Sequence, residues 1–228
     1  MEGSRMSRAI VFDLDGTLVD SAADIHAAVT QMLTEFGKPP LTLARVTSFI
    51  GNGIPNLVRL VMRDGGIPEA DENLAITRMM AYYAAHPADL SQPYPGVTDC
   101  LTRLQEAGIR LGVCTNKFRA PALQILEALD LMQYFEVVVG GDTLPVRKPD
   151  PAPLHHAFEA LGGTSRMYAG DSEVDAETAQ RASIDFALFT QGYRKTPVDQ
   201  LVTACTFDAF RNLPAIADRV MTVKAGSV

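Results

Sequence analysis

The sequence predicts an α/β protein with a Rossmann-like parallel sheet core and an inserted all-helical cap. Three observations carry this prediction. A short apolar run near the N-terminus ends in an acidic loop, a long stretch with helical periodicity follows, and the rest of the chain alternates between helix and strand patterns. We therefore expect a discontinuous core, residues 1–20 and 95–228, with the cap formed by residues 21–94.

The N-terminal elements are a strand and then a series of helices. Ala9–Phe12 is apolar and rich in β-forming residues, which predicts a buried strand that ends at the acidic loop 13–17. A helix is expected after Ser21, its N-cap, and Gly37 closes it. Apolar residues recur at helical spacing in this segment, at Ile25, Val29, Met32, Leu33 and Phe36. Further cap helices are expected at Thr42–Ile50, Ile54–Asp64 and Glu69–Ala85.

The turn cluster at residues 93–96 suits a linker, and after it helices and strands alternate. Such alternation predicts right-handed βαβ crossovers and a parallel sheet. The expected helices are Val97–Ala107, Ala120–Leu129, Asp150–Leu161 and Glu173–Ala182. The expected strands are Ile109–Cys114, Phe135–Val139, Met167–Ala169 and Phe186–Phe189.

Composition is that of an ordinary soluble globular protein, with 47% hydrophobic and 21% charged residues. The net charge is −7 and the 20 Lys and Arg are scattered, which argues against nucleic-acid binding and favours a small-molecule or metal partner. No apolar run is long enough for a membrane span, and the first eight residues are too few for a signal-peptide core. The three cysteines form no CxxC pair, so we expect neither disulfides nor a zinc site, and a cytoplasmic monomer or homodimer.

Polar residues follow four of the predicted strands. Ligands of an open parallel sheet bind outside the carboxyl ends of its strands, so we expect these side chains to converge. They are Asp13 and Asp15 after the first strand, Thr115, Asn116 and Lys117 after the second, Lys148 in the loop after the third, and Asp171 and Asp175 after the fourth.

Carboxylates gathered at one point repel each other, because unit charges ~4 Å apart interact at roughly 4 kcal/mol for an effective dielectric constant near 20. A shared divalent cation resolves this repulsion, and hard oxygen ligands favour Mg²⁺. Lys148 would supply further positive charge. One of the two carboxylates Asp13 and Asp15 can attack phosphorus, while the other donates a proton to the departing alkoxide, so the pattern predicts a phosphatase.

Each element also has a purely structural interpretation. The Asp15-Gly16 pair is typical of a hairpin turn, and Ser172 with Asp175 matches a helix capping box. Lys148 alone is typical of a solvated loop lysine, and Thr115 with Asn116 is typical of a strand-end turn. Their joint order favours one active site, because each element falls at the end of a different predicted strand.

The ordered motifs, a DxDGT loop, a strand-end Thr, a Lys before Pro and a GDSxxD segment, resemble the haloacid dehalogenase-like hydrolases across essentially the whole chain. This resemblance implies a nucleophile at Asp13 and a general acid and base at Asp15, whose presence points to phosphate esters rather than carbon–halogen bonds. It also implies Mg²⁺ binding by Asp13, the Asp15 carbonyl and Asp171, with support from Asp175. The phosphoryl group would be held by Thr115, the Asn116 amide and Lys148.

Within this superfamily, the segments 50–55, 94–97 and 115–117 are most similar to bacterial phosphoglycolate phosphatases. The implied substrate is a small phosphorylated metabolite, 2-phosphoglycolate. Its carboxylate would bind the amides of Gly53 and Ile54 at a helix N-terminus, with Arg59 or Arg45 adding charge. A helix–helix turn with surface arginines is the alternative for this segment.

Two other functions stay open at this point. A phosphomutase on the same scaffold would pass the aspartyl-phosphate to a sugar hydroxyl instead of water. A non-catalytic metabolite-binding protein would keep the pocket alone, although it would not need both Asp13 and Asp15.

Overall fold

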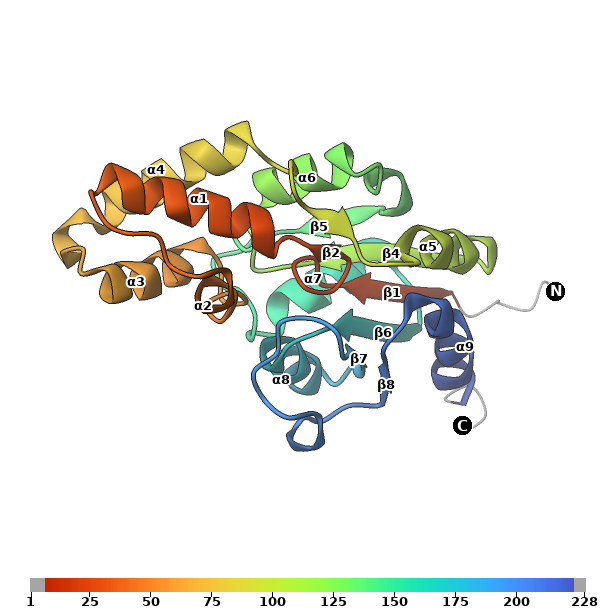
Figure 1. The fold of residues 1–228 in the computed structure, drawn as a ribbon. Coiled ribbons are helices and arrows are strands. Elements are labelled where there is room, and N and C mark those ends of the chain that lie inside the picture. The colour runs from red at the N-terminus through yellow and green to blue at the C-terminus, as the bar shows by residue number, and fades with distance from the viewer. Residues whose placement is uncertain (1–6, 224–228) are drawn as a thin grey trace.

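The structure is a computed structural model that describes residues 7–223, so residues 1–6 and 224–228 of the predicted core lie outside the described residues. Figure 1 shows helices α1–α4 gathered at one end of a sheet, and the arrows of β1 and β6 point toward them. The helical segment therefore lies over the carboxyl ends of the strands. None of the helices in the described part of the chain is long and apolar enough to cross a membrane.

A six-stranded sheet with parallel pairing forms the core, in the order β5-β4-β1-β6-β7-β8. Its strands are β1 (Arg8–Phe12), β4 (Ile109–Cys114), β5 (Val137–Val139), β6 (Ser165–Gly170), β7 (Asp185–Phe189) and β8 (Cys205–Phe207). The predicted α/β class and parallel sheet are confirmed. The sequence-based prediction missed β8 and the helix after it, because β8 has only three residues and no clear apolar run.

Helices cover both faces of the sheet, as the alternation of side chains along β1 requires. Ile10 and Phe12 pack in one apolar cluster with α5 (Val97–Glu106), α6 (Arg119–Ala128) and α9 (Leu213–Val223). Ala9 and Val11 point to the opposite face, where they pack with α7 (Ala152–Leu161) and α8 (Glu173–Ala182). The central strand is thus buried on both sides, which positions the loop after it rigidly.

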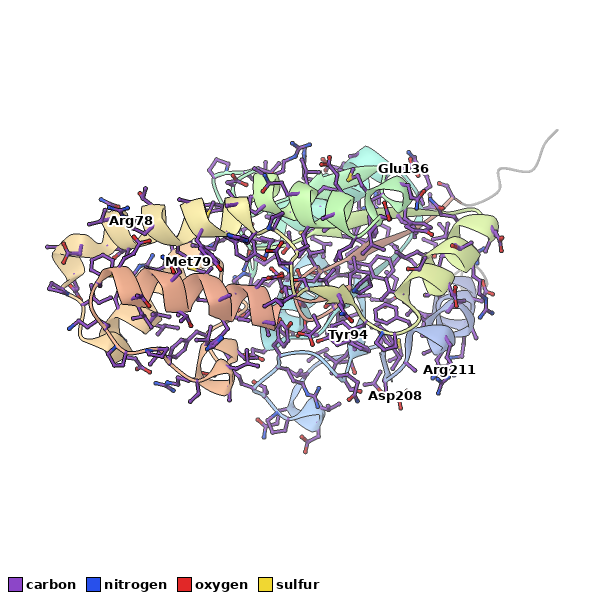
Figure 2. All side chains as sticks on the ribbon, turned by 45° about the horizontal axis from the view of Figure 1, so that its top comes forward. Arg78, Met79, Tyr94, Glu136, Asp208 and Arg211 are labelled. Carbon is purple, nitrogen blue, oxygen red and sulfur yellow. The ribbon has the colours of Figure 1, made fainter. Side chains whose placement is uncertain are left out.

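The segment between β2 (Val19–Asp20) and β3 (Gln92–Pro93) is helical, as predicted. It contains α1 (Ala22–Glu35), α2 (Leu43–Thr47), α3 (Ile54–Gly65) and α4 (Glu72–Ala85), with a short 3-10 turn at Glu69–Asp71 before α4. These helices share their own apolar cluster, to which Met79 contributes from α4. Figure 2 shows Met79 between α4 and α1, whereas Arg78 lies on the outer side of α4.

Two short antiparallel strands, β2 and β3, carry the chain into the helical segment and back. The sequence predicted only a turn cluster here, because a two-residue strand has no periodicity to detect. Beside this crossing, the buried carboxylate of Asp24 accepts hydrogen bonds from the Leu90 amide and from the amide and hydroxyl of Ser91. The entry to α1 and the return segment are therefore tied together.

Element boundaries differ from the predicted ones by a few residues. The predicted helix from Asp150 begins at Ala152, because the Asp150 carboxylate instead accepts a hydrogen bond from the Ala152 amide. The predicted strand from Phe135 begins at Val137, because the 3-10 turn Met132–Tyr134 ends immediately before Phe135.

Candidate active site

Three acidic side chains meet at the carboxyl ends of β1 and β6. Asp13 follows β1, Asp171 follows β6, and Asp175 lies on the first turn of α8. Each offers a carboxylate oxygen, these oxygens all lie within 4.8 Å of one another, and all three residues are buried. The convergence predicted from the sequence is confirmed for these three aspartates, and their spacing suits a shared metal ion.

Lys148 is buried among these carboxylates and is not a solvated loop lysine. Its Nζ lies 2.9 Å from Asp13 Oδ1 and 2.6 Å from Asp175 Oδ1. It also donates to the hydroxyl of Tyr168, which in turn donates to Asp175. Although burial favours the neutral amine, Asp13 and Asp175 raise the pKa of Lys148, so the residue stays cationic.

One lysine does not neutralise three buried acids. Burial raises the pKa of Asp13 from 3.8 to about 7 even though Lys148 acts in the opposite direction. Burial and the neighbouring Asp175 raise the pKa of Asp171 well above its ordinary value. Asp175 differs, because its bonds to Lys148 outweigh the effect of burial and lower its pKa. The site therefore has excess negative charge that a divalent cation would stabilise.

The capping box expected from Ser172 and Asp175 is present. The Ser172 hydroxyl accepts from the Asp175 amide, while Asp175 Oδ2 accepts from the Ser172 amide. The other oxygen of Asp175 bonds Lys148. The same carboxylate thus caps α8 and anchors the lysine, so the capping box does not exclude a place for Asp175 in the acidic cluster.

Asp171 is oriented by donors from two separate loops. The Thr17 hydroxyl donates to Oδ1 at 2.9 Å, and the Tyr193 amide donates to Oδ2 at 2.6 Å. Gly16, with φ +89°, must be glycine here, because a Cβ at this position would lie 2.6 Å from Asp171 Oδ2. Residues 11–15 and 17–21 do not form the alternative hairpin, because Val11 pairs with Gly112 of β4 and Tyr168 of β6.

Asp15 does not belong to the acidic cluster. Its carboxylate accepts hydrogen bonds from Lys117 Nζ at 3.0 and 3.1 Å and from the Ser21 hydroxyl at 2.5 Å. Lys117 also donates to the hydroxyl of Tyr83 on α4. A metal contact from Asp15 would thus use its backbone carbonyl, as the family resemblance implies, and its carboxylate faces the helical segment.

Thr115 and Asn116 lie directly after β4 and are both buried. Thr115 accepts a hydrogen bond from the Lys117 amide. The side-chain amide of Asn116 donates to the carbonyls of Gly51 and Lys148, so it joins the helical segment to the lysine loop. These residues are more than a strand-end turn, because they form the floor of a pocket together with Asp13 and Asp15.

This pocket lies between the strand ends and helices α1, α3 and α4, and encloses about 490 Å³ including its mouth. Its polar side chains come mainly from the sheet side, and its apolar wall comes from the helices. The apolar lining residues are Ile25, Ile50, Ile54, Leu57 and Met79. Gly53 lines it too, and a Cβ there would lie 2.8 Å from the Asn116 carbonyl oxygen.

The structure does not bring Arg59 or Arg45 to this pocket. Arg59 pairs with Glu72 at 2.9 Å and lines a separate surface depression, and Arg45 pairs with Asp64 on the exterior. Both arginine side chains are about half exposed. The predicted contribution of Arg59 to substrate binding has no geometric support, whereas Gly53 and Ile54 line the pocket, so binding at their amides stays a prediction.

Three tyrosines around the site were not singled out by sequence reasoning. Tyr168 donates to Asp175, and the Tyr193 amide donates to Asp171. Tyr83 bonds Lys117, which was expected at the strand ends without a stated role. The tyrosines lie on a helix, in a strand and in a loop, and their spacing in the sequence has no regular pattern.

Comparisons with known proteins agree with this geometry. Residues 10–189 match the family model of haloacid dehalogenase-like hydrolases. The chain belongs to the haloacid dehalogenase-like hydrolases. This haloacid dehalogenase-like chain is 47% identical over 214 residues to the phosphoglycolate phosphatase of Cereibacter sphaeroides, covering 93% of this chain and 98% of that protein.

More distant members of the family are similar over nearly the whole length. Phosphoglycolate phosphatase 1 of Pseudomonas aeruginosa is 37% identical over 227 residues, which cover 96% of this chain and 83% of that protein. Among solved structures, a predicted phosphoglycolate phosphatase from Haemophilus somnus matches with a TM-score of 0.88 and 29% identity, covering 94% of this chain and 99% of that one.

Proposed function

We propose that this protein is a Mg²⁺-dependent phosphatase that hydrolyses 2-phosphoglycolate through a phosphorylated Asp13. The observation that carries the proposal is the buried group of Asp13, Asp171 and Asp175 around Lys148, with Asp15 directly beside it. Two relatives, at 47% and 37% identity, are named phosphoglycolate phosphatases, and these names support 2-phosphoglycolate as the substrate.

The residues present fit Mg²⁺. The donors are hard carboxylate oxygens and they are buried, and burial raises the pKa of Asp13 to about 7 even beside Lys148, so a bound cation would stabilise the ionised form. We propose that Asp13, Asp171 and the Asp15 carbonyl hold the ion, while Asp175 supports it through Lys148. Bound Mg²⁺ would neutralise charge on the carboxylates and the phosphoryl oxygens.

In the first step, the Asp13 carboxylate attacks phosphorus while the bond between phosphorus and the ester oxygen breaks. Asp15 gives its proton to the departing glycolate oxygen. In the second step a water molecule attacks the phosphorus of phospho-Asp13 and its proton passes to Asp15, which regenerates both carboxyl groups and releases phosphate. Thr115, the Asn116 amide and Lys148 would hold the phosphoryl oxygens through both steps.

We propose that residues 21–94 act as a cap domain on a core formed by residues 1–20 and 95–228. Two features support this division: the helices have their own apolar cluster, and the chain enters and leaves them through the paired strands β2 and β3. Closure would exclude bulk water from the first step, and opening would release the products. We also assign the reaction to the cytosol, since the cysteines are free thiols, which suits a reducing compartment.

The test is phosphate release from 2-phosphoglycolate with Mg²⁺ and with EDTA. We expect Asp13→Asn and EDTA each to abolish turnover, because one removes the nucleophile and the other removes the cation. Asp208→Asn is a matched control, since Asp208 is an exposed acid outside the helical segment (Figure 2). Turnover that survives Asp13→Asn would refute the mechanism. In a parallel incubation with a bisphosphorylated sugar, an isomerised sugar phosphate without free phosphate would indicate a mutase.

A further inference from the structure

Lys117 stands at the boundary between the sheet edge and the helical segment. Its side chain is 4% exposed, and its ammonium group bonds Asp15 on one side and the Tyr83 hydroxyl on the other, the latter at 2.8 Å. The same ammonium lies 4.5 Å from the centre of the Tyr83 ring. A positive charge is therefore held in a defined position on the pocket wall, by one residue from the sheet side and one from α4.

The pair has one unused hydrogen-bond donor, the Tyr83 hydroxyl. The three donors of the Lys117 ammonium group go to both oxygens of Asp15 and to the Tyr83 hydroxyl. Because the Tyr83 hydroxyl accepts from Lys117, its own proton is available. Within residues 7–223 no side chain or carbonyl accepts that proton, and both residues line the pocket. A free hydroxyl donor beside a positive charge suits a carboxylate.

Lys117 is also the one cationic side chain among the described residues that line this pocket. The wall around it is apolar on the helical side, which strengthens its attraction for an anion. Arg59 and Arg45 are paired with carboxylates on the exterior and do not compete for a ligand here. An anionic group that extends from the phosphoryl site toward the helices meets Lys117.

The distances suit a short substrate. Asp15 oxygens lie 3.0 and 3.1 Å from Lys117 Nζ, and a hydrogen bond from Asp15 to the ester oxygen would span about 2.8 Å. The ester oxygen would then lie within about 6 Å of the ammonium group, given two consecutive hydrogen bonds. A carboxylate one carbon away from that oxygen can reach the ammonium group over this distance, and one on a longer spacer could do so only if the spacer bends.

We propose that Lys117 and Tyr83 bind the carboxylate of the substrate, and that this subsite selects short phosphate esters with a carboxylate on the carbon next to the ester oxygen. The inference rests on the proposed phosphatase function and assigns the recognition of its substrate to a lysine of the core and a tyrosine of α4. The helix N-terminus at Gly53 and the arginines Arg59 and Arg45 are not required for it.

The experiment compares kcat/KM for 2-phosphoglycolate and for its uncharged carboxamide analogue, with Mg²⁺ present. We expect the wild-type protein to prefer the carboxylate by about 10- to 100-fold, the range of a charge-assisted hydrogen bond. In Lys117→Met this preference is expected to fall to near one. Tyr83→Phe keeps the ring and is expected to reduce the preference about 5-fold, mainly through KM.

Arg78→Met is the matched control, because it removes one positive charge from the outer face of the same helix that carries Tyr83. Its preference for the carboxylate is expected to equal that of the wild type. An equal loss on both substrates in Lys117→Met would overturn the proposal, because it would show that Lys117 only holds Asp15. If Lys117→Met does not fold, an unchanged preference in Tyr83→Phe overturns it.

The two proposals fail in distinguishable ways. A wild-type protein that hydrolyses phosphoglycolate and the carboxamide equally well is a phosphatase without this subsite. A protein that is inactive on phosphoglycolate but prefers 2-phospholactate over isopropyl phosphate, and loses that preference in Lys117→Met, has the subsite and a different physiological ester.

Discussion

Removal of divalent cations is expected to destabilise this protein, and the loss is expected to grow as the pH rises from about 4 to about 7. The reason is the burial of Asp13, whose pKa rises from 3.8 to about 7 in the folded protein. Burial raises the pKa of Asp171 as well. Without a bound cation, the folded state therefore keeps protons in a pH range where the unfolded state has released them.

The sign follows from proton linkage. Stability falls with rising pH wherever the folded state binds more protons than the unfolded state, at about 1.36 kcal/mol per pH unit for one proton. For Asp13 the window runs from 3.8 to about 7, so the total loss is on the order of 4 kcal/mol. The shift of Asp171 acts in the same direction. The lowered pKa of Asp175 adds stability that is already present above its ordinary value of 3.8.

Saturating Mg²⁺ is expected to remove this loss, because it stabilises the ionised carboxylates. The assay is the thermal unfolding midpoint at pH 5 and pH 8, in EDTA and in MgCl₂ at matched ionic strength. About 3 kcal/mol of the loss falls between pH 5 and pH 7. For a chain of this length about 1 kcal/mol shifts the midpoint by roughly 2–4 °C, so the Mg²⁺ effect should be larger at pH 8 by roughly 5–10 °C.

Two results would refute this reasoning. One is an equal rise of the midpoint with Mg²⁺ at both pH values, and the other is no rise at all. Asp171→Asn serves as a further check, since it removes one of the three carboxylates and should lose most of the Mg²⁺ effect. The exposed-acid variant Asp208→Asn should retain the full effect.

Three further predictions concern contacts around the site. Lys148→Met should lower the free energy of unfolding in urea by about 3–5 kcal/mol, because it leaves buried carboxylates without their cation, and an unchanged midpoint would contradict the ion pairing. The Tyr193 hydroxyl accepts a hydrogen bond from the Ser21 amide, where the chain enters α1. Tyr193→Phe should therefore lower kcat/KM about 5-fold at nearly unchanged stability. Full activity of this variant would show that the contact is dispensable. Asp24→Ala should lower stability by about 1–3 kcal/mol and speed amide hydrogen exchange at Ser91, whose amide loses its acceptor; unchanged exchange would show that the link is not formed in solution.

Much of the acidic site could be predicted from the sequence, because the carboxyl ends of parallel strands share one edge of the sheet. That rule alone places Asp13 near Asp171, although 157 positions separate them along the chain, and the structure brings their oxygens within 4.8 Å. The helical segment was predicted by its periodicity and is confirmed, with small shifts at its ends. The short strands β2 and β3 carry too few residues for any pattern.

The sequence predicted the partners of individual side chains less well. Arg59 was expected at the substrate, yet it pairs with Glu72 on the outer surface, because the direction of a side chain around α3 depends on how that helix packs. Lys117 was expected among the strand-end residues without a partner, and only the structure shows that α4 places Tyr83 against it.

The sequence by itself determined the fold class, the helical insertion and the acids that converge at the strand ends, because hydrophobic periodicity and the alternation of helix and strand patterns are local or nearly local signals. Only the tertiary structure decided which cation faces which anion. Lys148 joins Asp13, while Lys117 joins Asp15, and these partners come from segments brought together by packing of the helices over the sheet. No spacing rule encodes such a pairing, since it depends on the directions of side chains from separate elements.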